Sequence, residues 1–336
     1  MKSIPLTRGR HAGNFVIALE QHGVPVEHHL SRANLPFALM ESPGSDDIIP
    51  AVSMLDFAER AAKDSGILDL GVRAGAVPIS NYGVFGARVI QAPTLYGAIQ
   101  TFCDEVCGEC SEADYYLSHD GSRAWFCHGP VGNPVLLQHE LYVLMIMTQV
   151  IQLALGDDWL PKQVQLQSSD ETSLTCNELM LSTNIEFGAP ITAIEVPLKS
   201  LAETLEPASG DKPITSNTES GLTTWGRLST DPVIALQELI SQSIRQSKQP
   251  TIDLAAEITG LSSRTLQRYL ASKATSFSKL VDQVRFNLAI SLLNDASTSI
   301  TAISYELGYS NVAHFSRAFR RMTGISPRAY RNALNR

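Results

Sequence analysis

Apolar side chains recur at helical spacing through the last hundred residues of the chain. Asp231 and Pro232 suit the start of a helix, because aspartate accepts hydrogen bonds from the first turn and proline lacks an N–H group that would stay unpaired there. The two apolar stripes that follow are Val233, Leu236, Leu239, Ile240 and Ile244, and further on Phe277, Leu280, Val281, Val284, Leu288 and Leu292. Each stripe predicts an amphipathic helix, and the second helix is long enough to hold two flanking motifs apart.

A helix-turn-helix pattern occurs once before this long helix and once after it. The first copy reads DLAAEITGLSSRTLQRYL, with Gly260 at the turn and Ser262 as the cap of its second helix. The second copy reads SITAISYELGYSNVAHFSRAFRR, with Ser299 as a cap and Gly308 at the turn. Glycine tolerates the positive φ of a tight corner between two helices. The side chains expected to face inward are Leu266 and Leu270 in the first copy, and Phe315, Phe319 and Met322 in the second.

The first 205 residues mix two patterns. Alternating apolar and polar positions predict strands, and a 3.6-residue period predicts helices. The expected strands are 112–118, 123–128, 162–167 and 191–197, and the expected helices are 11–22, 50–64, 93–107, 135–155 and 171–181. In DYYLSHDGSRAWFCH, the pair Asp120 and Gly121 indicates a hairpin turn. This half is therefore expected to be an α/β domain with an antiparallel sheet.

The predicted organisation is α+β. Residues 1–205 form the domain with the antiparallel sheet, and residues 206–230, rich in Ser, Thr, Gly, Pro and acidic side chains, form a linker. Residues 231–336 form an all-α domain with two helix-turn-helix motifs joined by a long helix.

The charge changes sign along the chain. Residues 231–336 contain 13 Lys and Arg against 7 Asp and Glu, whereas residues 1–230 contain 13 against 27. The whole chain has a formal net charge of −8. A basic domain beside an acidic one is typical of a protein whose basic part binds a polyanion such as nucleic acid.

Composition narrows the remaining choices. The chain has 336 residues, of which 44% are hydrophobic and 18% charged, which is enough for two ordinary cores. The longest apolar run, residues 141–147, is too short to span a bilayer, and no signal-peptide pattern follows the basic start. Five cysteines without a periodic framework fit a reducing compartment. We therefore expect a cytoplasmic protein without membrane contact.

The C-terminal residues resemble those of a known family. Residues 235–333, above all VDQVRFNLAISLL and GYSNVAHFSRAFRRMTGISPRAYR, resemble the DNA-binding domain of AraC/XylS-type transcription regulators. The positions in the family's register are Gly308, Tyr309, Phe315, Arg317, Phe319, Gly324, Ser326, Pro327, Tyr330 and Arg331. The chain departs from the pattern at Ser304, at Leu270 and before Thr275. The resemblance implies a regulator, an activator by expectation, that binds double-stranded promoter DNA and works with RNA polymerase.

The resemblance and the helical spacing together assign DNA contacts to the second helix of each motif. Arginine pairs bidentately with guanine and glutamine with adenine, whereas phosphates are met by arginines and by helix N-termini. The side chains expected to read bases are Arg264, Gln267, Arg268, His314 and Arg317. The positions expected to contact phosphates are Ser262, Asn311, Arg320, Arg321 and Arg328. Two such helices on one domain should enter successive major grooves about 34 Å apart; the alternative for each arginine is a solvated side chain.

The N-terminal half resembles the longer regulatory domain of an AraC/XylS subgroup that includes the ornithine-utilisation regulator and a quorum-sensing modulator. The segments that carry this resemblance are LGVRAGAVPISNYGVFGARVIQAPTLYGAIQ, LLQHELYVLMIMTQVIQLALGDDWLPKQVQL and FGAPITAIEVPLKSL. The resemblance implies a domain that senses a small-molecule effector, whose identity it leaves open, and that forms a homodimer. Candidate wall residues of the effector site, for which core packing is the alternative, are Tyr82, Phe85, Trp125 and Phe126.

One alternative is a regulator that responds to thiol chemistry or to a metal. The segment CDEVCGEC places Cys103, Cys107 and Cys110 at spacings of four and three. Three thiolates on one helical turn could share a metal with a nearby fourth ligand, for which His119, Cys127 and His128 are the candidates. The segment lacks the paired C-x-x-C arrangement, and we expect no bound metal.

A second alternative is a DNA alkylation-response enzyme that carries an AraC-type module. Such an enzyme needs its cysteines close upstream of the DNA-binding half, but Cys176 lies about 55 residues before Asp231. The sequence contains no glycine-rich phosphate loop, no G-x-S-x-G elbow and no H-E-x-x-H motif. We therefore expect a protein that is not an enzyme and needs no cofactor.

Overall fold

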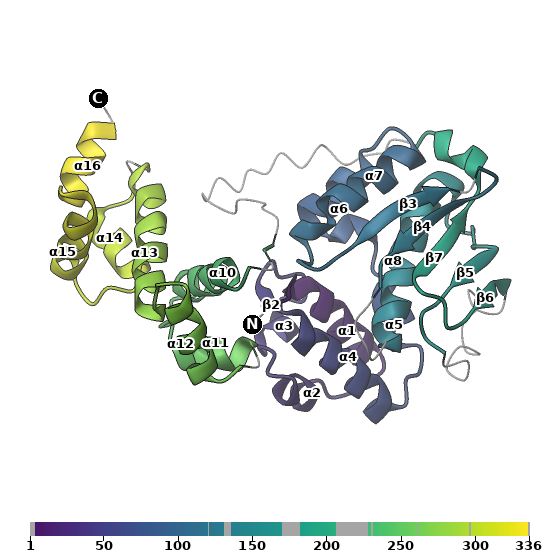
Figure 1. The fold of residues 1–336 in the computed structure, drawn as a ribbon, viewed down its shortest axis with the longest axis horizontal. Helices are drawn as coiled ribbons and strands as arrows, with labels where there is room; N and C mark the ends of the chain where they lie inside the picture. The colour runs from purple at the N-terminus through teal and green to yellow at the C-terminus, as the bar shows by residue number, and fades with distance from the viewer. Residues whose placement is uncertain are drawn as a thin grey trace. The chain divides into compact units, whose positions relative to one another are not determined.

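A computed structural model describes most of the chain, which divides into two compact units. The described residues are 4–119, 121–130, 136–169, 182–205, 228–229, 231–259, 261–295 and 297–334. The N-terminal unit contains residues 5–205 and the C-terminal unit residues 231–334. The sheet belongs to the N-terminal unit, and the described part of the C-terminal unit is helical (Figure 1). This is the α+β class that the sequence predicts.

Helices make up much of the N-terminal unit. They are α1 (Gly9–Gln21), α2 (Glu27–Arg32), α3 (Ala38–Glu41), α4 (Ala51–Ser65), α5 (Leu70–Gly75), α6 (Gly83–Ile90), α7 (Leu95–Glu105) and α8 (Leu137–Leu155). Three 3₁₀ helices are Ile79–Asn81, Val106–Gly108 and Leu198–Ala202. Helices α1, α4, α7 and α8 correspond to predicted helices. The predicted helix 171–181 lies outside the described residues, and the shorter α2, α3, α5 and α6 are additions to the prediction.

Within the described residues, a five-stranded sheet packs against α7 and α8 (Figure 1). Its strands lie in the order β3 (Tyr115–His119), β4 (Ala124–His128), β7 (Thr192–Val196), β5 (Gln163–Gln165) and β6 (Asn184–Glu186). Neighbouring strands are antiparallel except β5 and β6, which run parallel. Phe126 lies opposite Leu117 on one side and Ile194 on the other, so these three side chains share one face of the sheet.

The predicted hairpin joins β3 to β4. Gly121 at its turn has a φ of 87°, and Asp120 lies outside the described residues. A separate ribbon, which the sequence pattern does not predict, pairs β1 (Leu6–Arg8) with β2 (Ile48–Pro50) in antiparallel fashion. Its strands are three residues long, too short to show an alternating pattern.

Glycine allows α5 to approach α8 closely. A Cβ atom at Gly71 would lie 2.0 Å from the carbonyl oxygen of Gln138, a contact that no side chain can make. The Gln138 side chain adds two hydrogen bonds between α8 and the start of α5. Its Oε1 accepts from the Gly71 N–H at 2.8 Å, and its Nε2 donates to the Leu68 carbonyl at 2.9 Å. This contact fixes the start of α8.

We expect Gly71→Ala to destabilise the protein by about 1–3 kcal/mol, because the added methyl group forces α5 and α8 apart. Gly44→Ala is the matched control, since a Cβ atom there has no neighbour within 4 Å; it should stay within about 0.5 kcal/mol of the wild type. Denaturant unfolding monitored by circular dichroism gives both values. Equal stability of the two variants would show that the close approach is not required.

The C-terminal unit consists of seven helices in its described part. They are α10 (Pro232–Arg245), α11 (Ile252–Thr259), α12 (Ser263–Ser272), α13 (Phe277–Leu293), α14 (Ile300–Glu306), α15 (Val312–Thr323) and α16 (Pro327–Leu334). The pairs α11–α12 and α14–α15 are the two predicted helix-turn-helix motifs, and α13 is the predicted long helix between them (Figure 1). Gly308 at the second turn has a φ of 74°, as its role requires. Gly260 lies outside the described residues.

The core of the second motif corrects one prediction. Phe315 and Phe319 are buried as expected, at 1% and 2% exposed, but Met322 is 40% exposed. Phe286 of α13 and Tyr330 of α16 pack against Phe319, with ring centroids 5.7 and 5.5 Å away. The aromatic core therefore ends at Phe319, and Met322 lies about one helical turn further along α15, outside this core.

Candidate nucleic-acid interface and ligand cavity

The start of each recognition helix, α12 or α15, is fixed by a side-chain cap. Ser262 Oγ accepts from the Thr265 N–H at 3.2 Å, and Asn311 Oδ1 accepts from the His314 N–H at 2.9 Å. Ser263 at the start of α12 also donates to Asp253 Oδ1 on α11 at 2.6 Å, which ties the two helices of the first motif together. The two caps are as predicted, and their hydrogen bonds fix where each recognition helix begins.

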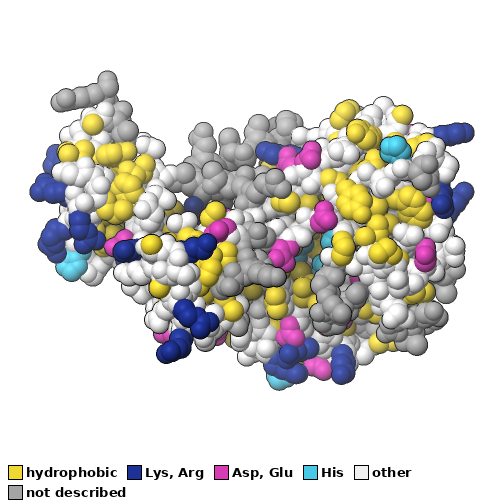
Figure 2. Space-filling view, viewed as in Figure 1, with side chains coloured by type: hydrophobic (Ala, Val, Ile, Leu, Met, Phe, Trp, Pro, Cys, Tyr) yellow, Lys and Arg dark blue, Asp and Glu magenta, His cyan; other side chains and the backbone are white. Residues whose placement is uncertain are grey.

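The exposed face of each recognition helix carries the predicted DNA-contacting side chains. Leu266 and Leu270 of α12 are fully buried, as are Phe315 and Phe319 of α15, so both helices are seated by their apolar faces. All ten predicted positions are exposed: Ser262, Arg264, Gln267, Arg268, Asn311, His314, Arg317, Arg320, Arg321 and Arg328. Figure 2 shows Lys and Arg side chains gathered along the edge of the C-terminal unit at the left of the view.

Three arginines make contacts between α13 and the helices after it, a role that sequence reasoning assigns to none of them. Arg285 Nε donates to the Leu307 carbonyl at 3.1 Å, and its guanidinium lies 5.1 Å from the centroid of the Tyr309 ring. Arg331 Nε donates to the Leu293 carbonyl at 3.3 Å. Arg321, predicted to contact phosphate, pairs with Asp282 of α13 at 3.3 Å while remaining 70% exposed.

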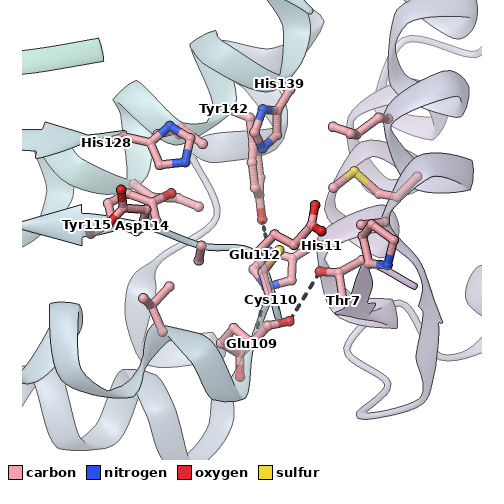
Figure 3. A pocket seen from close by; sticks show the side chains of 18 of the residues that line it. Thr7, His11, Glu109, Cys110, Glu112, Asp114, Tyr115, His128, His139 and Tyr142 are labelled. Carbon is pink, nitrogen blue, oxygen red and sulfur yellow. Dashed lines mark hydrogen bonds and ion pairs between the residues drawn. The ribbon is translucent and has the colours of Figure 1, made fainter. Parts of the chain in front are cut away.

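The N-terminal unit contains a cavity of about 180 Å³ that several distant segments line. Figure 3 shows His139 and Tyr142 of α8, His128 of β4 and His11 of α1 around this space. Its lining also includes Thr7, Met54, Leu55, Tyr82, Phe85, Phe102, Val106, Glu109, Cys110, Glu112, Asp114, Tyr115 and Ile146. The cavity therefore combines aromatic and aliphatic walls with an unusual number of titratable side chains.

A hydrogen-bond network supports one side of the cavity. His11 Nε2 lies 3.0 Å from Glu109 Oε2, and His11 Nδ1 lies 2.8 Å from the Tyr142 hydroxyl. The Tyr82 and Tyr142 hydroxyls are 3.0 Å apart, and Asn14 Nδ2 donates to both, at 2.8 and 3.2 Å. Burial raises the pKa of Tyr82 and Tyr142, so both hydroxyls are neutral and can donate.

Three buried polar atoms around the cavity have no hydrogen-bond partner among the described residues. They are Glu109 Oε1, His128 Nδ1 and His139 Nδ1. Glu109 is 0% and His128 8% exposed. Burial lowers the pKa of His128 to about 3 and that of His139 to about 4, each helped by a neighbouring histidine. Both rings are therefore neutral at physiological pH.

The structure brings only two of the four predicted wall residues to this cavity. Tyr82 and Phe85 line it, whereas Trp125 and Phe126 do not. Phe126 is fully buried and packs edge-on against Phe102, with ring centroids 5.4 Å apart. Trp125, its neighbour on β4, points to the opposite face of the sheet, where the Arg123 guanidinium lies 5.4 Å from its ring centroid.

The cysteine cluster does not form a metal-binding group in the described part of the chain. No group of three or more His, Cys, Asp or Glu side chains is placed to hold a metal ion there. Burial raises the pKa of Cys103 to about 12 and those of Cys110 and Cys127 to about 11, which keeps these thiols protonated. Cys176 lies outside the described residues.

Comparison with known proteins agrees with this architecture. Residues 23–205, more than half of the chain, match the arabinose-binding domain of AraC transcription regulators, and residues 255–333 match a helix-turn-helix domain. This chain belongs to the AraC family of transcription regulators.

Among AraC-family relatives, two come from Pseudomonas aeruginosa. The HTH-type transcriptional regulator VqsM is 37% identical over 98 residues, which are 29% of this chain and 30% of VqsM. The ornithine utilization regulator is 36% identical over 84 residues, 25% of either chain. An uncharacterized HTH-type transcriptional regulator of Mycobacterium tuberculosis is 25% identical over 328 residues, 92% of either chain. The subgroup predicted from the sequence is confirmed. In the described part of this AraC-family chain, every helix is too short or too polar to cross a membrane.

We expect the two buried histidines to make the protein less stable in acid. Both bind protons in the unfolded state below a pKa of 6.5 but resist protonation in the folded state down to about pH 4. Stability should therefore fall as the pH drops from 6.5 to about 4, by up to about 1.4 kcal/mol per pH unit for each histidine. The double variant His128→Gln/His139→Gln lacks both rings. Denaturant unfolding at a series of pH values should show that its free energy of unfolding falls less steeply with decreasing pH than that of the wild type.

His28→Gln is the control for this series, because His28 is exposed on α2. Its stability should follow the wild type at every pH. If the double variant also parallels the wild type, the two rings are not held neutral by burial.

Proposed function

We propose that this AraC-family protein binds a specific promoter site through α12 and α15, and that a small molecule in the N-terminal cavity controls this binding. The observation that carries the proposal is the pair of capped recognition helices in one unit, each seated by buried apolar side chains and each exposing arginines. Activation through RNA polymerase, homodimerisation by the N-terminal unit and a cytoplasmic location are further parts of the proposal.

Affinity for DNA comes first from phosphate contacts, which are insensitive to sequence and weaken with salt. Arg320 and Arg328 are exposed and suited to this role, and Arg321 can serve it from its position beside Asp282. The N–H groups at the starts of α12 and α15 add hydrogen-bond donors for phosphate oxygens. The proposal thus assigns Arg320 and Arg328 to the DNA backbone and gives Arg321 two roles, one toward DNA and one toward Asp282 of α13.

Sequence preference comes from side chains that reach base edges in the major groove. On α12, Arg264, Gln267 and Arg268 are exposed, and on α15, His314 and Arg317 are exposed. With α13 between the motifs, one unit can present both helices to successive major grooves about 34 Å apart. A single unit would then read an asymmetric site without two-fold symmetry.

We expect Arg317→Ala to reduce the preference for a specific site by about tenfold or more, because one bidentate contact with guanine is worth about 1–3 kcal/mol. A high-affinity duplex is first selected from a random pool with the wild-type protein. Fluorescence anisotropy at fixed salt then compares this duplex with a scrambled one. Lys248→Ala, an exposed substitution outside both motifs, is the control and should keep the full preference. An unchanged preference in Arg317→Ala would remove its role in base reading.

Arg320→Ala should act differently from Arg317→Ala. A lost phosphate contact weakens binding to the selected and scrambled duplexes alike and lowers the slope of log affinity against log salt by about one. Titrations at several salt concentrations measure this slope. A change in the ratio of the two affinities, with the slope unchanged, would assign Arg320 to base reading instead.

A further inference from the structure

The cavity in the N-terminal unit is lined by two chemically different sets of side chains. The apolar set includes Met54, Leu55, Phe85, Phe102 and Ile146. The polar set comprises acidic side chains and histidines, namely Glu109, Glu112, Asp114, His128 and His139. A ligand that contacts both sets has an apolar body and a polar head.

Glu109 offers an unused acceptor in the polar set. The side chain is 0% exposed. Its Oε2 atom forms a hydrogen bond with His11 Nε2 at 3.0 Å and lies 3.6 Å from Arg10 Nε. Its Oε1 atom has no partner among the described residues. A buried carboxylate oxygen without a hydrogen bond is costly, so a donor supplied by a ligand would be strongly favoured.

The two histidines add hydrogen-bonding atoms without adding charge. The rings of His128 and His139 lie 5.9 Å apart, and the Nδ1 atom of each is unpartnered in the described structure. Burial keeps the pKa of each ring far below neutrality, so both are uncharged at physiological pH. A neutral imidazole keeps one ring nitrogen as an acceptor. These rings therefore do not repel a cation.

The charged side chains of the cavity lining are acidic. Three carboxylates line it, whereas no lysine or arginine among the described residues does. Arg8 and Arg10 lie outside the lining: Arg8 donates to the carbonyls of Gly108 and Asp46, and Arg10 pairs with the Asp46 carboxylate and with one lining carboxylate, Glu109. A cationic head is therefore favoured, and the carboxylate of a free amino acid would find no cation in the lining.

We propose that the cavity binds a small primary amine in its ammonium form, with its N–H groups directed to Glu109 and its apolar body against Phe85, Phe102 and the aliphatic wall. This inference names the class of effector and rests on the regulatory role proposed above. A cavity of 150 Å³ in another protein holds benzene, so a cavity of about 180 Å³ takes about six to nine non-hydrogen atoms. The ammonium supplies three donors, which a quaternary ammonium of equal charge lacks.

Benzylamine is the probe, and benzyl alcohol and benzoate are its neutral and anionic counterparts. Each is titrated into the full-length protein at neutral pH, by calorimetry and by thermal shift. Benzylamine should raise the melting temperature, and benzyl alcohol should bind at least about tenfold more weakly, because hydrogen bonds to a charged partner are stronger than neutral ones. Benzoate should not bind. Equal or tighter binding of benzyl alcohol or benzoate would overturn the inference, as would the absence of benzylamine binding at about millimolar concentration.

A pair of charge variants at the cavity mouth tests the same point without disturbing the core. Val52 of α4 lines the cavity and is 62% exposed, so both Val52→Lys and Val52→Glu should fold. Val52→Lys should weaken benzylamine binding several-fold relative to Val52→Glu, because like charges repel at short range. Identical affinities would contradict an electrostatic origin of binding.

Glu109→Gln tests the head-group contact directly and should weaken benzylamine binding by about tenfold or more. Asp104→Asn removes the same charge from an exposed position outside the cavity and should bind benzylamine as the wild type does. Equal affinity in both variants would overturn the contact with Glu109. If Glu109→Gln fails to fold, the Val52 pair decides the question.

The duplex titration separates this inference from the proposed function. Benzylamine binding is measured without DNA, so a protein that reads its DNA site but ignores benzylamine would overturn the ligand class alone. A protein that binds benzylamine but shows no preference between duplexes would overturn the proposed function and leave the ligand class supported.

Discussion

The buried Glu109 connects β1 and α1 and, through His11, α8 of the N-terminal unit, and the cavity depends on it. Its carbonyl oxygen accepts from the Arg8 N–H at 2.9 Å and from the Thr7 hydroxyl at 3.2 Å, both on β1. Its carboxylate reaches His11 on α1, which in turn reaches Tyr142 on α8. Because a buried carboxylate is tolerated only where partners surround it, α1 must lie where His11 and Arg10 reach Glu109. The same arrangement satisfies one carboxylate oxygen and leaves the other without a hydrogen-bond donor among the described residues.

In the C-terminal unit the comparable constraint is the attachment of the second motif to α13. Arg285 and Arg331 each donate to a carbonyl near the end of a helix, at Leu307 and Leu293. Such carbonyls lack partners within their own helix, and cations are favoured beside them. Arginines of this unit therefore fall into two groups by geometry. One group makes contacts between α13 and the helices after it, with Arg285 bonded to Leu307 at the turn and Arg331 bonded to Leu293. The other group points to solvent from α12, α15 and α16.

Much of this architecture could be predicted from the sequence because the elements that matter are long and regular. Several features are local signals, each set by residues within a few positions of one another. They are the apolar stripes of α10 and α13, the caps Ser262 and Asn311, and Gly308 at the turn. Helices α2, α3 and α5 are at most six residues long, too short to show a period. Met322 lies on the predicted face of α15, but only the position of Tyr330 on α16 shows that the core ends before it.

The cavity could be predicted only in part, because distant segments form it. The sequence pattern of CDEVCGEC is dominated by its cysteines. The residue of that segment that makes a buried long-range contact is Glu109, whose partner His11 is 98 positions away. No local sequence pattern predicts a contact between residues so far apart. The alternation of β4 does exclude one reading in advance, since neighbouring side chains on a strand point to opposite faces and Trp125 and Phe126 cannot line one wall together.

Helix α8 places its cavity-lining and sheet-facing side chains at consecutive positions. His139 lines the cavity, while the Glu140 carboxylate accepts from the N–H groups of Gln167 and Ser168 and from the Thr192 hydroxyl at the start of β7. The cavity lining and the hydrogen bonds to β7 therefore depend on the same helix, at two consecutive residues.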